Sequence, residues 1–190
     1  SPHLLYGGAI DETLKWYTER RKEGIIPDPE TVLRLFAAAL ARRTLSKKDF
    51  ETYRERGRSA LSGYLAKYAE TWITDTESAV SIKVLFGTGI AELPLITLRG
   101  ELDKVERLGG DAIRIIDYKT GKPKTRGEIE GTTKTSNGNL KRQLVFYHFL
   151  VQNDLVRSWK GNEALLDFVE PDAKGKYRRE SYTITGEDIV

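Results

Sequence analysis

Cysteine is absent from this 190-residue chain. Without thiols, the chain can form no disulfide, no zinc–thiolate site and no cysteine-ligated iron–sulfur cluster. Long apolar runs are also missing: the longest are far too short to span a bilayer, and no secretory signal precedes the first predicted helix. We therefore expect a cytoplasmic protein that has no contact with a membrane.

A strong net charge is absent as well, because 31 lysines and arginines stand against 28 aspartates and glutamates, for a formal charge of +3. Affinity for nucleic acid would have to come from a local basic patch rather than from the overall field. The length predicts one domain over residues 1–190, with a helical lobe at 1–74 and an α/β core at 75–190. The chain opens without Met, and we expect it to be a fragment of a longer protein.

Hydrophobic periodicity predicts helices first and strands afterwards. Two helices are expected before and after Gly24, the second starting near Pro29, and a third after Ser46, which has Asp49 three residues on, as in a capping box. The third helix has an aromatic stripe that we expect in the core: Phe50, Tyr53, Leu61, Tyr64, Leu65, Tyr68 and Trp72. From about residue 76 the period changes to two, which predicts a strand, a hairpin at 95–116, a polar loop at 121–138, a helix from about 140, and strands at 164–169 and 178–184. These elements describe an α/β sandwich around a mixed sheet.

The hairpin carries the residues of greatest chemical interest: Asp103, Asp117 and Lys119. Asp117 and Lys119 share one strand face, and pairing the arms about Gly110 puts Asp103 opposite Asp117 at roughly 5 Å between Cβ atoms. A plain two-residue turn would shift the register by one and separate the carboxylates. The site therefore requires an odd-length loop or a bulge. An Asp-x-Lys on a strand is more often a solvated face, but here it ends a strand that is apolar on both faces.

With these motifs, the chain resembles the RecB-like branch of the PD-(D/E)XK nucleases, found at the C-terminus of UvrD/Rep-type helicases and in the AddAB and RecBCD enzymes. "GELDKVE" is similar to the family's Gly-x-x-Asp-(Arg/Lys)-(Val/Ile) strand, which implies that Asp103 is the first metal ligand. "IIDYKTGK" is similar to its Asp-Tyr-Lys-Thr-Gly signature, which implies that Asp117 is the second ligand and Lys119 the catalytic lysine. "QLVFYHFL" resembles the Gln-x-x-x-Tyr motif, which gives Gln143 and Tyr147 a role at the DNA or in bracing the site.

The resemblance implies a restriction-endonuclease-like mixed β-sheet flanked by helices, with an N-terminal helical lobe. It implies a Mg²⁺- or Mn²⁺-dependent nuclease without an iron–sulfur cluster, most simply a single-strand DNA exonuclease in repair or recombination. A UvrD/Rep-type helicase motor would be its partner, in the same chain or in a complex. The Tyr118 carbonyl is an expected further ligand. Glu77 resembles an acidic residue often seen at the first strand, although a solvated strand start explains it equally well.

One position departs from the family pattern. The upstream Gly-x-x-x-His-Glu motif corresponds to "GGAIDETL", with Asp11 where the metal-binding histidine would be. Aspartate is a good oxygen ligand for Mg²⁺ or Mn²⁺, so the site either persists with altered preference or is weakened. The alternative is an inactive nuclease-fold module that binds DNA or scaffolds a helicase. A sequence-specific endonuclease of the same fold is a third hypothesis.

Basic side chains crowd the stretch after the predicted catalytic strand. A run of charges is often only a solvated face. This one starts directly after Lys119 and contains three glycines, so we predict a mobile loop that contacts DNA phosphates. The residues are Lys122, Lys124, Arg126, Lys134, Lys141 and Arg142.

Overall fold

The computed structural model describes residues 1–189, which form two compact units built from discontinuous segments. The helical unit comprises residues 1–76, 118–123 and 167–179, and the sheet unit comprises residues 77–117, 124–166 and the chain from 180 onward. The helical unit thus begins with the expected helical lobe and adds the ends of two strands. None of the helices described is both long and apolar enough to cross a lipid bilayer.

Three helices make up most of the helical unit: α1 (Pro2–Lys22), α2 (Pro29–Ala41) and α3 (Lys47–Tyr68). Their ends follow the sequence signals. Gly24 has a φ of +78° just after α1, a backbone conformation that glycine adopts without strain. The Ser46 hydroxyl accepts a hydrogen bond from the Asp49 N–H at 3.1 Å, so the predicted N-cap of α3 is confirmed.

The core of the helical unit is aromatic. Tyr64, Tyr68 and Trp72 are buried as predicted, and Tyr17 meets Trp72 edge-to-face with 4.9 Å between ring centroids. The stripe differs from expectation at its start, where Phe50 and Tyr53 are only half-buried. The predicted core therefore lies mainly in the second half of α3.

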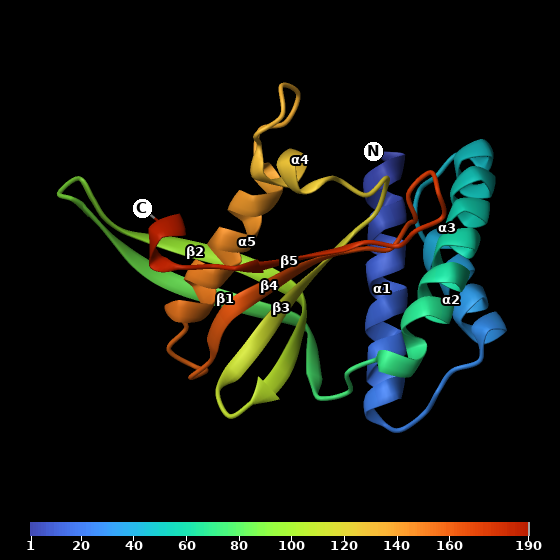
Figure 1. Ribbon diagram of the computed structural model, residues 1–190, viewed down its shortest axis with the longest axis horizontal. Helices are drawn as coiled ribbons and strands as arrows, with labels where there is room; N and C mark the ends of the chain where they lie inside the picture. Colours follow the sequence, from blue (N-terminus) through green and yellow to red (C-terminus); the bar gives the residue numbers. More distant parts are fainter. Residues whose placement is uncertain (190) are drawn as a thin grey trace. The chain divides into compact units, whose positions relative to one another are not determined.

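A five-stranded sheet follows, in the order β1-β2-β3-β4-β5 (Figure 1). Its strands are β1 (Thr76–Ile90), β2 (Leu93–Gly109), β3 (Ala112–Lys119), β4 (Lys160–Phe168) and β5 (Arg179–Thr183). Backbone hydrogen bonds from Lys160 N to Asp111 O and from Val169 N to Lys119 O join corresponding ends of β3 and β4, so these strands are parallel. Because β2 and β3 are antiparallel, the sheet is mixed, and the α/β prediction is confirmed.

Strands β2 and β3 pair with one irregularity. The register runs from Lys104↔Ile116 to Arg107↔Ile113 and then shifts to Gly109↔Ala112. Leu108 is the extra residue of a β-bulge, which the two-residue loop Gly110–Asp111 alone would not supply. Of the two devices that the predicted site requires, an odd-length loop or a bulge, the structure has the bulge.

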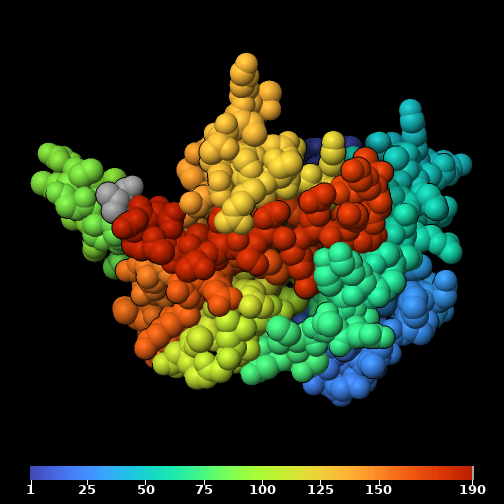
Figure 2. Space-filling view, in the orientation of Figure 1, coloured from blue at the N-terminus to red at the C-terminus, as the bar shows by residue number. Residues whose placement is uncertain are grey.

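The segment between β3 and β4 contains more structure than predicted. The polar stretch 121–138 includes a short helix, α4 (Arg126–Glu130), started by a capping box in which Thr125 and Glu128 bond each other's backbone N–H. The connection from α4 to α5 (Asn139–Gln152) protrudes beyond both helices (Figures 1 and 2). The expectation of one long loop is thus corrected, because local capping stabilises a helical turn within it.

Candidate active site

The two candidate aspartates belong to one face of the sheet unit. One step beyond the pair Lys104↔Ile116, the same register sets Asp103 opposite Asp117. Directly opposed residues in an antiparallel pair lie roughly 5 Å apart at Cβ. Asp117 is only 3% exposed, and the strand before it is buried from Ile115 onward. The buried carboxylate of Asp117 is thus held beside that of Asp103. A divalent cation would stabilise this arrangement.

Helix α5 contributes two polar side chains to the same region. The Gln143 amide donates a hydrogen bond to the Tyr147 hydroxyl at 2.9 Å. The pKa of the Tyr147 phenol is raised to about 12, first because the ring is buried and next because of the negative charge of Asp117. Asp103 and Glu101 raise it further, while the hydrogen bond with Gln143 opposes them.

The phenol of Tyr147 therefore lies within the field of three carboxylates. Two of them were predicted, and the third, Glu101, was not. The signal for Glu101 was available in the sequence, because it is two residues before Asp103 and so shares its face. The structure thus brings Asp103, Asp117, Gln143 and Tyr147 together within the sheet unit.

Lys119 ends β3 and belongs to the helical unit. It lies two residues after Asp117 and therefore on the same strand face. Its carbonyl accepts a hydrogen bond from the Val169 N–H at 2.9 Å. Two residues on, the Gly121 N–H donates to the Glu170 carboxylate at 2.6 Å. The backbone around Lys119 is thus fixed by consecutive residues that follow β4.

The donor set fits a hard cation with few protein ligands. Among residues 1–189 there is no cluster of three or more His, Cys, Asp or Glu side chains that could hold a metal ion. Mg²⁺ in phosphoryl-transfer sites commonly uses one or two carboxylates and takes its remaining ligands from water and substrate phosphate. Asp103 and Asp117, with the Tyr118 carbonyl as a further oxygen, suit that pattern.

Metal binding by the two other predicted ligands, Glu77 and Asp11, stays a prediction. Glu77 forms an ion pair with Arg107, which is four residues, or about 13 Å, along β2 from Asp103. This contact joins the start of β1 to β2. Asp11 is exposed on α1 in the helical unit, and its role in metal binding stays a prediction.

Most of the predicted phosphate contacts already have partners. Lys124 pairs with Glu128 at 3.9 Å, and Lys141 with Asp188 at 2.9 Å. Arg126 pairs with Glu130 at 3.0 Å and with Glu180 at 3.5 Å. Arg142 bonds the Asn139 side chain, whereas Lys122 forms no ion pair within the part of the chain that the structure describes. Exposed pairs of this kind contribute little to stability, so their cations can exchange a carboxylate for a phosphate.

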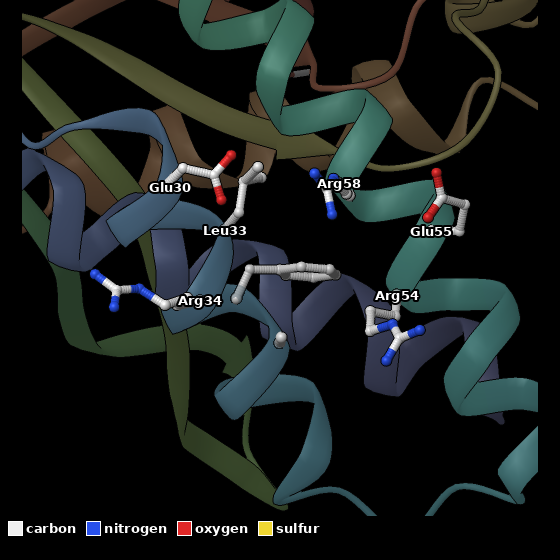
Figure 3. Close-up of a pocket in the computed structure, with 8 residues that line it drawn as sticks. Glu30, Leu33, Arg34, Arg54, Glu55 and Arg58 are labelled. Atoms are coloured by element: carbon white, nitrogen blue, oxygen red, sulfur yellow. The ribbon is translucent and has the colours of Figure 1, made fainter.

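A cavity of about 350 Å³ lies between α2 and α3 in the helical unit. Arg34, Arg54 and Arg58 line it together with Glu30 and Glu55 (Figure 3). None of the predicted metal ligands belongs to its lining. This cavity was not expected from the sequence.

A mixed sheet with helices and facing aspartates on adjacent strands defines the restriction-endonuclease-like class of α/β proteins. The model of the PD-(D/E)XK nuclease superfamily matches residues 1–188, and the chain belongs to that superfamily. Membership implies a nuclease, that is, a phosphodiesterase of nucleic acids, and enzymes of this superfamily typically use Mg²⁺ or Mn²⁺. The RecB-like subtype stays a prediction.

Other comparisons add little. No curated protein matches the chain. Among solved structures it is similar to the crystal structure of SSO0001, with a TM-score of 0.41 and 13% identity over 90% of this chain and 75% of that chain. Similarity this low carries no functional argument.

Proposed function

We propose that the chain is a divalent-metal-dependent DNA nuclease whose site is formed by Asp103, Asp117 and Lys119. The observation that carries this proposal is the bulged register of β2 and β3, which aligns the two aspartates on one face. The position of Tyr147 is consistent with it, because burial first and then the negative charges of Asp117 and Asp103 raise the pKa of its phenol.

Each side chain has a role that its chemistry suits. Asp103 and Asp117 would hold Mg²⁺ or Mn²⁺, with the Tyr118 carbonyl as an additional oxygen ligand. When bound, the ion supplies Lewis acidity for activating water and for polarising the scissile phosphate. The Lys119 ammonium orients the attacking water and offsets the negative charge that develops on the pentavalent phosphate. Gln143 keeps the Tyr147 hydroxyl directed along the site.

The substrate is single-stranded DNA, cleaved from an end, in a repair or recombination complex that includes a UvrD/Rep-type helicase. This finer proposal rests on the resemblance of the Asp-Tyr-Lys-Thr-Gly and Gln-x-x-x-Tyr motifs to RecB-like nucleases. The basic residues after Lys119 support the proposal that the DNA strand runs along this segment. Lys122, which has no ion pair within residues 1–189, is its first contact.

The second candidate function is an inactive nuclease-fold module that binds DNA, favoured by Asp11 in place of the family histidine. The two candidates differ in metal binding. If the chain is an enzyme, calorimetric titration with Mn²⁺ should show heat of binding for the wild type and none for Asp103→Asn. Binding that Asp103→Asn leaves intact would favour the inactive module.

The deciding experiment is a cleavage assay on end-labelled single-stranded DNA with Mn²⁺. We expect cleavage by the wild type and a loss of about 10²–10³-fold or more in Lys119→Ala, because transition-state charge is no longer offset. Circular dichroism and melting of both proteins provide the control for folding. Equal cleavage by the Lys119→Ala variant would refute the assignment of the lysine.

A further inference from the structure

We propose that Glu170 is a positioning residue for Lys119, an inference that rests on the proposed function. No motif of the sequence singles out Glu170. In the structure its carboxylate accepts the Gly121 N–H at 2.6 Å, two residues after the lysine. Its neighbour Val169 donates its N–H to the Lys119 carbonyl at 2.9 Å. The backbone from the lysine carbonyl to Gly121 is thus fixed at two points by one dipeptide.

Gly121 has a conformation that suits this contact. Its φ of +96° lies in the region that side-chain-bearing residues rarely adopt. A Cβ atom there would meet nothing closer than 3.8 Å, so crowding does not explain the glycine. The backbone turn itself requires glycine, and in this turn the Gly121 N–H points toward the Glu170 carboxylate.

Glu170 is in turn fixed by the helical unit. Arg56 of α3 donates two hydrogen bonds to it, Nε to Oε2 at 2.7 Å and Nη2 to Oε1 at 2.9 Å. Such fork-shaped pairs restrict both the position and the plane of a carboxylate. Glu170 is 9% exposed, so few water molecules compete for it.

An aromatic platform supports the pair. The Arg56 guanidinium lies 5.0 Å from the Tyr6 ring centroid, and Tyr6 stacks on Tyr53 with 5.0 Å between centroids. The pKa of the Tyr6 phenol is raised above its usual value, first because the ring is buried and next because of the Glu170 charge. A chain of contacts therefore runs from Tyr6 through Arg56 and Glu170 to the backbone beside Lys119.

The helical unit also contains a pair that serves as a matched control. Asp167, three residues before Glu170, accepts from the Tyr64 hydroxyl at 2.6 Å and from Arg179 Nε at 3.1 Å. It is fully buried and also connects α3 to the segment after β4. Neither Tyr64 nor Arg179 belongs to residues 119–121. A variant that loses a hydrogen bond to Asp167 therefore weakens the helical unit without changing the contacts of the backbone beside Lys119.

The experiment compares Glu170→Ala, Glu170→Gln and Tyr64→Phe in the full chain. We expect Glu170→Ala to lower kcat about 10- to 100-fold, since misplacement of a catalytic group by about 1 Å has an effect of that size. The KM for single-stranded DNA and the Mn²⁺ affinity should stay within about twofold. Glu170→Gln keeps an oxygen acceptor for the Gly121 N–H and should recover most of kcat. Tyr64→Phe should lower the melting temperature and leave kcat unchanged.

Hydrogen exchange at the Gly121 amide gives a readout that does not depend on activity. Its protection should be lost in Glu170→Ala, kept in Glu170→Gln and kept in Tyr64→Phe. If Glu170→Ala and Tyr64→Phe lower the melting temperature equally and also lower kcat equally, Glu170 has only a structural role and the inference is overturned. If the wild type is active and Glu170→Ala is fully active too, this inference is refuted while the proposed function stands. An inactive wild type refutes the proposed function and this inference with it.

Discussion

Two pairs of carboxylates in this molecule differ in how their members are arranged. In the helical unit, Asp167 and Glu170 each bond an arginine: Asp167 meets Arg179 at 3.0 Å, and Glu170 meets Arg56 at 2.7 Å. In the sheet unit, Asp103 and Asp117 face each other across two strands and add their negative charges at Tyr147. Removing one member of a buried ion pair destabilises a fold, whereas two carboxylates set side by side are a common mark of a functional site.

The largest expected effect is on the rate of DNA cleavage, which should depend on one pair of carboxylates and not on the other. Asp117→Asn should lower cleavage of single-stranded DNA by about 10²–10³-fold, because the proposed metal site loses a charged ligand. Asp167→Asn, an equal change in size and charge, should leave kcat within about threefold. Steady-state cleavage with saturating Mn²⁺ measures both. Comparable losses in the two variants would remove the distinction between the pairs.

The second effect concerns stability without metal. Asp167→Ala should lower the free energy of unfolding by about 1–3 kcal/mol, because it leaves the buried Tyr64 hydroxyl without its acceptor. Asp103→Asn should lower it by less, because Asp103 is more exposed than Asp167 and asparagine keeps its size. Urea unfolding in EDTA measures both free energies. A loss of several kcal/mol in Asp103→Asn would identify that aspartate as structural.

A third effect lies in the alkaline titration of Tyr147. Its folded pKa of about 12 exceeds the unfolded value of about 10. The stability that this difference contributes is complete below pH 10 and is lost as the pH rises through 12. Asp117→Asn should lower the folded pKa more than Asp103→Asn does, because Asp117 has the larger influence. Tyrosinate absorbance, with Tyr147→Phe as the reference, would show the order, and an unchanged pKa in both variants would contradict the proximity of these groups.

The smallest effect tests the basic residues beside the site. Lys122→Gln should flatten the dependence of log K on log salt by about 0.7, the value for one contact with a single strand. Arg126→Gln should flatten it less, since Glu130 and Glu180 already pair with that side chain. Lys15→Gln, exposed on α1, serves as the control. Slopes that match the control would remove the proposed DNA path.

The sequence was most informative where the signal was local. The N-cap at Ser46 and the need for an odd-length loop or a bulge before Ile113 followed from neighbouring residues. The bonds to Asp167 and Glu170 could not be predicted. Tyr64 lies 103 residues before Asp167, and Arg56 lies 114 before Glu170. No periodicity links positions so far apart. The helix α4 was also missed, since five residues give too short a pattern.

The extra residue at Leu108 has a consequence for how this hairpin can change in length. Removing one residue from the turn would put β2 and β3 out of step, and every side chain of β3 would turn to the opposite face relative to β2. Gains or losses of two residues preserve the alternation. Insertions tolerated during evolution should therefore come in even numbers here, a parity rule that a library of turn variants would expose directly.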